Sequence, residues 1–575
     1  MKHLFLVCFA VLSFSSFSQG FLHRDGQKIV DGNGKNIVLR GLGLGGWMVQ
    51  EGYMIQTGAF AGSQYKIKQK ITDLIGATAT EEFYKAYKKN GITKRDIDSL
   101  AAWGFNSIRL PMHYNLYTPA IETEKNGKIT WLEEGFKMTD DLLKWCAANK
   151  IYLILDLHAA PGGQGKDAAI SDYDDSKPSL WESTANQDKM VALWEKLAQR
   201  YKDNPWIGGY DIINEPNWNF TGTNQNGCDE TSNAPLRALQ VRITKAIRAI
   251  DTNHLIIIEG NCWGNNYNGI FPLWDENMAL SFHKYWNTND TASIQTMLNY
   301  RTQYNVPIWL GESGENSNVW FEESISLMES NTIGWAYWPM KKIENLAGVT
   351  SVTKPAGYDK ILEYWKNGGV KPDAGFSKKV LMQMAENYKI ENLTIRYDVI
   401  DAMFRQVQTN DTKKYKSHQL PGRVYAAEFD LGQNGYAYAD NDVANYDGTQ
   451  FTQWNKGGKM RNDGVDIEAC TDTETNGFQV SFIEDKEWLQ FTCDVKKEAL
   501  FDVAVRYSSE KAGGKLYLES EGVTISETID LPVSGGFNKW KTITLKNVAL
   551  KQGINKIRVN FEGGSFNLNF LEFKK

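Results

Sequence analysis

The sequence predicts an α/β protein built as a (β/α)8 TIM barrel followed by an all-β, jelly-roll-like sandwich. Apolar, β-rich runs alternate with helical periodicity over the first 340 residues, which is typical of βα units around a parallel sheet. After about residue 415 the pattern changes to short alternating strands with Gly and Asn turns, which is typical of a sandwich. A chain of 575 residues also exceeds the roughly 250–300 residues that one hydrophobic core can serve.

The barrel prediction depends on eight apolar runs of strand length. They are Ile37–Gly46, Phe105–Met112, Ile151–His158, Ile207–Pro216, His254–Trp263, Met278–Tyr285, Val306–Gly314 and Thr332–Met340. The helical stretches between them are Trp131–Lys150, Asp188–Lys202, Asn233–Asp251, Thr291–Asn305 and Phe321–Asn331. Eight strands with interleaved helices close a barrel. We expect Phe21–Asn36 to form a hairpin under the barrel, and Gly357–Asn367 and Ser377–Lys389 to complete its outer ring of helices.

The sandwich prediction depends on a second set of short strands. They are Trp488–Val495, Leu500–Tyr507, Lys515–Ser520, Trp540–Val548, Asn555–Glu562 and Asn567–Phe573. The expected divisions are a signal peptide at 1–19, a barrel domain at 20–390, a connector at 391–417 and the sandwich at 418–575.

The N-terminus has the pattern of a secretory signal peptide. Lys2 and His3 precede an apolar run from Leu4 to Phe14 and then a stretch of small residues. No later apolar run approaches the ~18–20 residues that cross a bilayer. We expect a protein released from the cell or into the periplasm, without a membrane anchor.

The cysteines do not indicate a disulfide framework. Cys8 lies in the leader, and the other five of the six cysteines are scattered at irregular spacing over a large chain. Cys470 with Cys493 is the one pair that we consider, and we expect buried free thiols instead.

Charge and aromatic content favour a neutral partner. The formal net charge of −6 provides no attractive field for nucleic acid or for an anionic membrane. Aromatic residues make up 12% of the chain, and flat rings stack on sugar faces. We expect a neutral polysaccharide or oligosaccharide as partner, no nucleic acid, no required cofactor and a monomeric chain.

Polar residues end nearly every apolar run of the predicted barrel. They are Arg109, His113, His158, Asn214, Glu215, Glu259, Asn261, His283, Tyr285, Glu312, Glu315 and Trp338. The C-terminal strand ends of such a barrel share one rim, where active sites are built. Cleavage of a glycosidic bond needs two carboxyl groups, one protonated and one ionised. Glu215 and Glu312 end the fourth and seventh strands, so they are expected to face each other across the barrel mouth.

These motifs together resemble glycoside hydrolase family 5. The resemblance rests on Asp211–Pro216, Ile308–Glu312, Arg109, His158, His283–Tyr285 and Trp338 in this strand order, and it covers roughly Phe21 to Lys389. It implies that Glu215 is the acid/base, that Glu312 is the nucleophile, and that the anomeric configuration is retained. It also implies substrate-binding roles for Arg109, His158, Asn214, His283, Tyr285 and Trp338.

Some roles at the rim stay open. His158 and His283 could instead be zinc ligands, although the carboxylate pair explains the site without a metal. Glu259, Glu315 and His113 could contact substrate or support those that do. Most tryptophans are expected in the core; Trp47, Trp218 and Trp263 are the loop candidates for sugar stacking.

Two segments of the sequence indicate which substrate the enzyme favours. Arg40–Trp47 and Asp156–Gln164 look most like the members of the family that act on β-1,3-glucans, and the alternatives are β-1,4-glucan and β-mannan. The inserts Glu51–Lys94 and Ala159–Gln187 are expected to shape the cleft. A transglycosylase on the same site and a non-catalytic sugar-binding protein are the competing functions.

Residues from Pro421 to Lys575 are similar to carbohydrate-binding module family 6. The sugar-sandwiching aromatic pair of that family falls on Met460 and Phe537, with Asn567 retained. The family also implies a structural calcium, for which Glu428 fits while Ala426 and Asn569 stand where acidic residues are common. A sandwich that only packs on the barrel is therefore as plausible as a working sugar-binding module.

Overall fold

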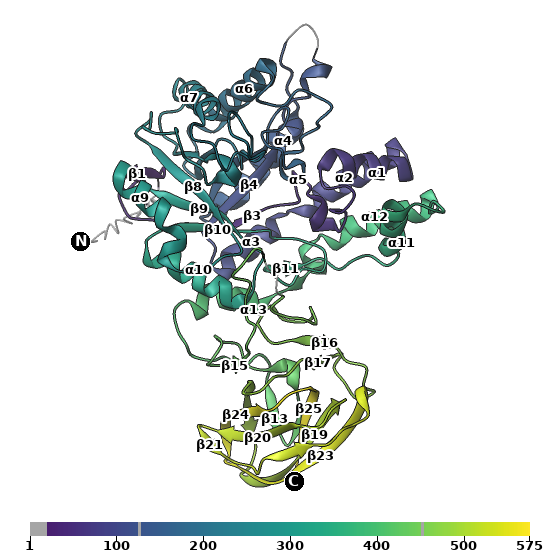
Figure 1. Cartoon of the computed structure of the whole chain (residues 1–575). Helices are drawn as coiled ribbons and strands as arrows, with labels where there is room; N and C mark the ends of the chain where they lie inside the picture. The colour runs from purple at the N-terminus through teal and green to yellow at the C-terminus, as the bar shows by residue number, and fades with distance from the viewer. Residues whose placement is uncertain (1–19, 125–127, 450–452) are drawn as a thin grey trace, which may run out of the picture.

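The computed structural model describes residues 20–124, 128–449 and 453–575 as two domains in contact (Figure 1). The predicted signal peptide at 1–19 lies outside the described residues. Within the described part of the chain, no helix is both long enough and apolar enough to cross a membrane.

Eight parallel strands close the predicted barrel, which confirms the fold class of the first part. They are β3 (Arg40–Gly43), β4 (Ser107–His113), β5 (Tyr152–Ala159), β6 (Ile207–Asp211), β7 (Ile256–Ile258), β8 (Met278–Lys284), β9 (Ile308–Gly314) and β10 (Gly334–Trp338). The strands neighbour each other in chain order, and β10 pairs with β3 to close the ring. Every strand residue is buried except Arg40, because helices cover the outside and side chains fill the inside.

The crossover helices follow the strands as expected. They are α3 (Lys94–Trp103), α4 (Glu133–Ala148), α6 (Thr184–Tyr201), α7 (Ala234–Arg248), α9 (Gln295–Tyr304) and α10 (Asn318–Ser330). Local sequence sets their ends, as α3 illustrates. Thr93 and Asp96 form a capping box at its start, and Gly104 ends it in the left-handed conformation.

The lower end of the barrel is an apolar plug covered by a hairpin. Strands β1 (His23–Asp25) and β2 (Lys28–Val30) form the expected antiparallel pair. Leu22 and Ile29 pack on a cluster inside the strands that includes Ile154, Ile257 and Trp309. The barrel is therefore solid at this end.

The outer ring is completed differently from the prediction. The helices α11 (Tyr358–Asn367) and α12 (Ala374–Asn387) pack with α1 (Gln64–Ile75) and α2 (Ala77–Gly91) in a separate hydrophobic cluster beside the barrel (Figure 1). Their apolar faces match each other, so they bury one another rather than the strands.

The place between α10 and α3 is taken by a segment of the predicted connector. Helix α13 (Tyr397–Asp401) continues into one π-helical turn, η6 (Ala402–Gln406). Phe404 packs edge-on against Phe105 at 5.0 Å and contacts Trp335. The connector therefore belongs to the barrel's helical layer.

Two sheets form the sandwich, as predicted, and their strand pairs are antiparallel apart from the parallel pair β13 and β18. One contains β13 (His418–Leu420), β15 (Tyr438–Ala439), β18 (Trp488–Val495), β20 (Gly514–Ser520), β21 (Val523–Thr524), β22 (Ile529–Leu531) and β24 (Gly553–Glu562). The other contains β14 (Gly422–Tyr425), β16 (Ile467–Ala469), β17 (Phe478–Val480), β19 (Ala499–Ser509), β23 (Gly536–Leu550) and β25 (Phe566–Lys574). Their inner faces share one hydrophobic core that is separate from the cores of the barrel.

The prediction of free thiols is wrong for Cys228 and Cys262 and is confirmed for Cys146, Cys470 and Cys493. Cys228 and Cys262 form a disulfide with a Cα–Cα distance of 4.7 Å, whereas Cys470 and Cys493 are free. The bond joins the loop after β6 to the segment after β7. The two cysteines are 34 residues apart in the sequence, and only the neighbouring strand ends bring them together.

Candidate active site

A cavity of about 1100 Å³ opens at the C-terminal ends of the barrel strands. Six of the predicted site residues line it: His158, Glu215, His283, Tyr285, Glu312 and Trp338. Both predicted catalytic carboxylates are nearly buried, with 5% exposure for Glu215 and 6% for Glu312.

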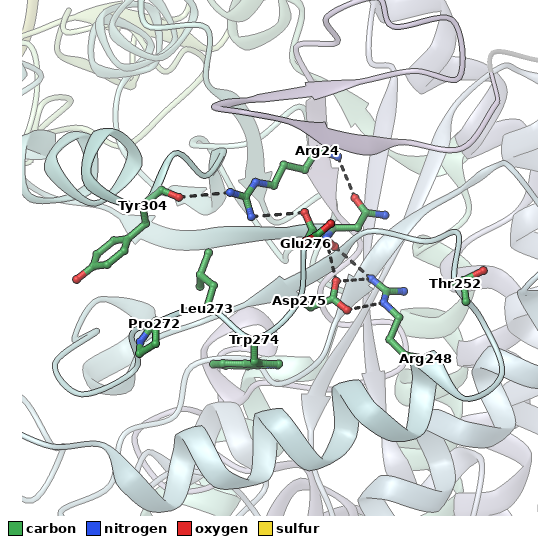
Figure 2. A pocket seen from close by; sticks show the side chains of 10 residues that line it. Arg24, Arg248, Thr252, Pro272, Leu273, Trp274, Asp275, Glu276 and Tyr304 are labelled. Atoms are coloured by element: carbon green, nitrogen blue, oxygen red, sulfur yellow. Dashed lines mark hydrogen bonds and ion pairs between the residues drawn. The ribbon is translucent and has the colours of Figure 1, made fainter.

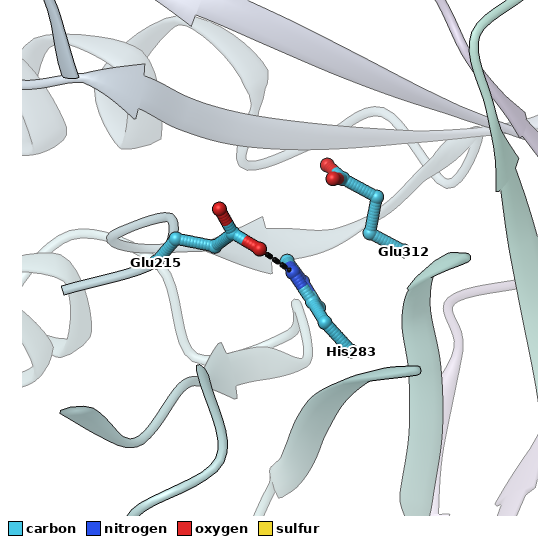
Figure 3. A group of neighbouring side chains, drawn as sticks. All are labelled: Glu215, His283 and Glu312. Carbon is cyan, nitrogen blue, oxygen red and sulfur yellow. Dashed lines mark hydrogen bonds and ion pairs between the residues drawn. The ribbon is translucent and has the colours of Figure 1, made fainter. Parts of the chain in front are cut away.

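Glu215 and Glu312 approach each other across the mouth of the barrel (Figure 3). One carboxylate oxygen of each residue and one ring nitrogen of His283 all lie within 4.8 Å of one another. Retaining glycosidases place their two carboxyl groups about 5–5.5 Å apart, whereas inverting enzymes leave about 6.5–9.5 Å for a water molecule. The short separation suits direct attack by one of the carboxylates.

The Glu312 carboxylate is held from both sides. Arg109 Nη1 donates to its Oε2 at 2.8 Å, and the Tyr285 hydroxyl donates to its Oε1 at 2.7 Å. A guanidinium and a hydroxyl both stabilise the ionised form of a carboxylate. Both oxygens are thereby oriented at the end of strand β9.

Arg109 lies behind the cavity rather than on its wall. Its guanidinium is fully buried and also contacts Asp156, Asp211 and Glu259 at 2.9–3.2 Å. Its Nη2 donates to Asn214 Oδ1 at 2.7 Å, and Asn214 is buried as well. One guanidinium thus holds five side chains at the C-terminal ends of the strands. We therefore interpret Arg109 as a positioning residue rather than one that touches substrate.

Glu215 sits in a different electrostatic setting. Its Oε1 lies 2.5 Å from His283 Nδ1, and burial, with Glu312 and Glu259 nearby, raises its pKa above the ordinary carboxyl value despite the histidine. His283 Nε2 in turn lies 3.2 Å from Glu259 Oε1. Burial alone would lower the pKa of His283, but these two carboxylates raise it well above 6.5.

The backbone of Glu215 is strained. Its φ of 43° lies in the left-handed region, which costs a non-glycine residue about 1 kcal/mol or more. The Glu259 carboxylate accepts a hydrogen bond from its backbone N–H at 2.7 Å, and Asn217 donates to its carbonyl at 3.1 Å. Glu259 therefore supports the predicted acid/base from behind.

Trp338 and His158 form one wall of the cavity. Their rings stack in parallel at 5.2 Å, and Trp338 Nε1 donates to the Tyr53 hydroxyl at 2.7 Å. A Cβ at Gly45 would fall 2.4 Å from Trp338, so the glycine-rich segment after β3 lets the indole lie flat on the backbone. Burial would lower the pKa of His158, but Asp156 and Glu51 raise it to about 10.

Glu51 and Tyr53 line the cavity; they belong to the insert that was expected to shape the cleft but were not predicted as site residues. The Glu51 carboxylate lies 3.8 Å from His158 Nε2, and burial raises its pKa to about 7. The available signal was an acidic residue directly after the glycine-rich first strand run, in Gln50-Glu51-Gly52-Tyr53. A carboxyl beside the reacting pair can accept a hydrogen bond from a sugar hydroxyl.

Of the other residues predicted at the rim, some line the cavity and others support the loops around it. Glu315 lines the cavity and pairs with Lys342 at 2.6 Å. His113 pairs with Asp172 at 2.9 Å, outside the cavity lining, and so supports the insert after β5. Asn261 donates to the Trp218 carbonyl at 2.8 Å and ties two loops together.

Of the three tryptophans proposed for sugar stacking, only Trp263 lines the cavity. Trp47 is buried and donates to the Lys88 carbonyl at 2.8 Å. Trp218 is buried beneath the Lys166 ammonium, which lies 3.7 Å from the ring centroid. These two serve packing, so the predicted stacking role is wrong for them.

A second hollow, of about 760 Å³, lies at the N-terminal ends of strands β7 to β9 (Figure 2). Its charged groups bind each other or the backbone. Arg248 forms an ion pair with Asp275 at 2.8 Å, and Arg24 donates to the Asn305 carbonyl at 2.8 Å. This end of such a barrel serves stability rather than chemistry.

No metal was expected in the barrel, although one possible ligand atom each of Glu215, His283 and Glu312 lie within 4.8 Å of one another. Glu312 accepts hydrogen bonds there from Arg109 and Tyr285, and the two ring nitrogens of His283 contact Glu215 and Glu259. In the sandwich, the Glu428 carboxylate pairs with the Lys416 ammonium at 2.8 Å. A cationic partner on the only expected carboxylate does not fit a structural calcium.

Comparison with known proteins matches both domains. Residues 65–343 match the family model of the cellulases, glycosyl hydrolase family 5, and residues 459–575 match that of carbohydrate binding module family 6. The barrel domain therefore matches glycosyl hydrolase family 5 and the sandwich matches carbohydrate binding module family 6, the two families that the sequence motifs resemble.

Relatives of the family 5 domain carry several names. A "Beta-xylosidase" of Phanerodontia chrysosporium is 35% identical over 268 residues, which is 46% of this chain and 52% of that protein. "Endoglucanase C" of Acetivibrio thermocellus is 24% identical over 53% of this chain and 91% of that protein. "Probable glucan 1,3-beta-glucosidase A" of Aspergillus niger is 27% identical over 32% and 42%. The chain thus spans about half the length of the xylosidase that it resembles.

Solved structures are also similar to the family 5 domain. Endoglucanase Cel5A from Thermotoga maritima is 20% identical, with a TM-score of 0.35 and coverage of 43% of this chain and 82% of that chain. "Cellulase Cel5C_n" is 17% identical, with a TM-score of 0.40 and coverage of 63% and 92%.

Proposed function

We propose that this chain is a retaining β-glycosidase that hydrolyses a β-glucan, with β-1,3-glucan as the favoured substrate, through a covalent glycosyl-enzyme. The observation that carries the proposal is the pair Glu215 and Glu312, within 4.8 Å of each other and in opposite electrostatic settings. One carboxyl has a raised pKa, and the other accepts hydrogen bonds from a guanidinium and a hydroxyl.

In the first step the Glu312 carboxylate attacks the anomeric carbon and the bond from that carbon to the glycosidic oxygen breaks. Glu215 gives its proton to the departing oxygen, so the aglycone leaves as an alcohol. The raised pKa of Glu215 keeps this proton available at a pH where an ordinary glutamate is ionised.

In the second step the ionised Glu215 takes a proton from water, and the water oxygen attacks the anomeric carbon. The bond to Glu312 breaks, Glu312 regains its negative charge and Glu215 regains its proton. Two inversions at one carbon return the β configuration. His283 and Glu259 hold Glu215 during both transfers.

The substrate class is supported by three features. The segments Arg40–Trp47 and Asp156–Gln164 resemble those of β-1,3-glucan-active family members, and a 1,3-β-glucosidase and an endoglucanase are among the named relatives. The cavity wall is rich in tryptophan, including Trp263, Trp286 and Trp338. Aromatic faces and a few polar groups suit a neutral sugar.

A β-xylosidase is the second candidate, because the relative with 35% identity bears that name. The two candidates differ at the sugar carbon that carries a hydroxymethyl group in glucose and a hydrogen in xylose. Comparing aryl β-glucosides with aryl β-xylosides therefore separates them.

We further propose that the protein acts outside the cytoplasm. The predicted leader at 1–19 supports this, and so does the Cys228–Cys262 disulfide, since such bonds persist in oxidising compartments. Mass spectrometry of protein recovered from the medium or periplasm tests it: a mature N-terminus near Gln19 or Gly20 is expected, and an intact Met1 contradicts it.

The test of the proposed activity is sugar release from laminarin, mixed-linkage glucan, cellulose, β-mannan and xylan, together with aryl β-glucosides and β-xylosides. We expect release from a β-glucan, with the β-anomer as the first product seen by proton NMR and no loss of rate in EDTA. Glu215→Gln and Glu312→Gln are the matched controls, each keeping the side-chain shape while removing the charge. No release from any substrate, or an α-anomer as first product, contradicts the proposal.

A further inference from the structure

The wall of the catalytic cavity is not made by the barrel alone. Gln453, Trp454, Asn455 and Gly458 also line it, and they belong to the sandwich-side segment between β15 and β16. The indole of Trp454 is half-buried against the hydrophobic core of the barrel. Its Nε1 donates to Asn462 Oδ1 at 3.0 Å, which fixes the ring plane.

This segment is bound to the loop that follows Glu312. Asn316 donates to the Asn445 carbonyl at 2.7 Å and accepts from the Asn445 N–H at 3.1 Å. Asn462 donates to the Asn316 carbonyl at 2.9 Å and to Asn318 Oδ1 at 3.1 Å. All four asparagines are buried, so the contact is a buried polar network rather than a loose surface touch.

A second set of contacts joins the same segment to the barrel. The Gly448 N–H donates to the Trp286 carbonyl at 3.1 Å, and Trp286 lines the cavity with 40% of its surface exposed. The Tyr446 hydroxyl lies 2.9 Å from both carboxylate oxygens of Glu323. The sandwich therefore supports one wall tryptophan and supplies another.

Residues 454–463 of this segment are held in place by hydrogen bonds and an ion pair of their own. Asn455 donates to the carbonyls of Lys459 and Arg461 and accepts from two backbone N–H groups. Arg461 is fully buried and binds Asp463 at 2.6 Å. Trp454 is thus presented to the cavity on a rigid loop, as a binding platform requires.

We propose that the sandwich contributes a sugar-binding subsite to the catalytic cleft, with Trp454 as its stacking platform. The inference rests on the proposed function. It means that the sandwich binds sugar within the catalytic cleft of the barrel. A cavity of about 1100 Å³ has room for more than the one sugar unit at the carboxylates. Trp454 serves a sugar unit further along the chain.

The surface that carries sugar in the related modules supports this assignment. Of its two aromatic positions, one is Met460 here, whose carbonyl accepts a hydrogen bond from Arg396 of the connector. Phe537 remains 40% exposed and lies outside the cavity lining. The Met460 backbone thus contacts the connector while its side chain packs against the core of the sandwich. Phe537 provides a matched aromatic control in the same domain.

The experiment compares Trp454→Ala, Trp454→Phe and Phe537→Ala in the full-length protein. We measure kcat/KM for a series of β-gluco-oligosaccharides from two to six units and for an aryl β-glucoside. Trp454→Ala should lower kcat/KM about tenfold for the longer oligosaccharides and less than twofold for the aryl glucoside. Trp454→Phe should keep most of the activity, and Phe537→Ala should match the unmodified protein.

Two results overturn the proposal: equal loss on every substrate, which means that Trp454 only supports the fold of the site, or no loss on any. Calorimetric binding of a hexasaccharide to Glu312→Gln with and without Trp454→Ala gives a reading that does not need turnover. Weaker binding only in the double variant supports the subsite. If the unmodified protein hydrolyses none of these glucans, the proposed function fails, which is distinct from a failure of Trp454 alone.

Discussion

The two ends of the barrel are built from the same strands and carry opposite kinds of side chain. At the C-terminal end, Arg109 gathers the carboxylates of Asp156, Asp211, Glu259 and Glu312 beneath an open cavity. At the N-terminal end, an apolar plug fills the barrel, and the charged groups at its rim, such as Arg248 and Asp275, satisfy each other. We therefore expect that removing a buried charge lowers catalytic activity at the C-terminal end and lowers the free energy of unfolding at the N-terminal end.

The largest effect is expected for Glu312→Gln at the functional end. The amide keeps the shape but cannot form the glycosyl-enzyme, so kcat/KM on the active substrate should fall by about 10⁴-fold. The melting temperature should change little, because Arg109 keeps three other carboxylate partners. Steady-state kinetics and thermal unfolding of the same preparation test both statements.

Its matched control at the other end is Asp251→Asn. The Asp251 carboxylate is buried and accepts from the Tyr210 hydroxyl at 2.8 Å and from the Asn253 N–H. His254 and these partners hold the pKa of Asp251 below its usual value against the effect of burial. The amide should lower the free energy of unfolding by about 1–3 kcal/mol and leave kcat unchanged. Equal losses of activity in the two variants would refute the division between the ends.

The next effect concerns pH. Burial and the neighbouring carboxylates raise the pKa of Glu215, and its protonated form is the active one. The value of kcat/KM should therefore fall as the pH rises through that pKa, which lies above the ordinary value of about 4.3. In Glu215→Ala, an aryl glycoside with a good leaving group should be cleaved without this alkaline decline.

A rim carboxylate serves as the comparison for this profile. Glu315 lines the same cavity but pairs with Lys342 at 2.6 Å. Glu315→Gln should keep the alkaline decline of the unmodified protein. If Glu215→Ala shows the same decline as Glu315→Gln, another group controls it and the assignment of Glu215 is wrong.

The last prediction sharpens the comparison, because it concerns stability rather than activity at the functional end. The Cys228–Cys262 bond closes a loop with a sequence separation of 34 and precedes Trp263 of the cavity wall. Replacing both cysteines with serine should lower the free energy of unfolding by about 3–4 kcal/mol. Denaturant unfolding should also become insensitive to reductant.

Cys470→Ser is the control for this replacement, since its thiol is free and half-buried. It should leave both the unfolding curve and its response to reductant unchanged. A double serine variant as stable as the unmodified protein would show that the loops at this end are held by hydrogen bonds alone.

Much of the barrel could be predicted because its strands are buried on both faces. Continuous apolar runs such as Ile151–His158 and Val306–Gly314 can be recognised as strands even when the neighbouring strands are unknown. The polar residue at the end of each run then falls at one rim by topology, which placed Glu215 and Glu312 in one cavity before their distance was known. The strands of the sandwich were predicted from a different pattern, the alternation of buried and exposed residues that β20 and much of β24 show.

Other features needed the folded chain. Glu51 and Tyr53 follow a short glycine-rich strand, and no periodic pattern marks loop residues that bend into a cavity. The helices α11 and α12 are amphipathic, but an apolar helix face does not specify the surface on which it packs. In the folded chain these two helices pack on α1 and α2 rather than on the barrel. The disulfide likewise depends on two loops meeting above neighbouring strands.

By itself the sequence determined the (β/α)8 barrel, the sandwich and the chemistry at the strand ends, because hydrophobic periodicity and residue type act locally. The tertiary structure alone decided which groups share a proton or a charge, as with His283 between Glu215 and Glu259. It also brought Trp454 to a cavity whose carboxylates lie more than a hundred residues earlier in the chain. Distances between side chains set pKa values and subsites, and these distances exist only once the chain has folded.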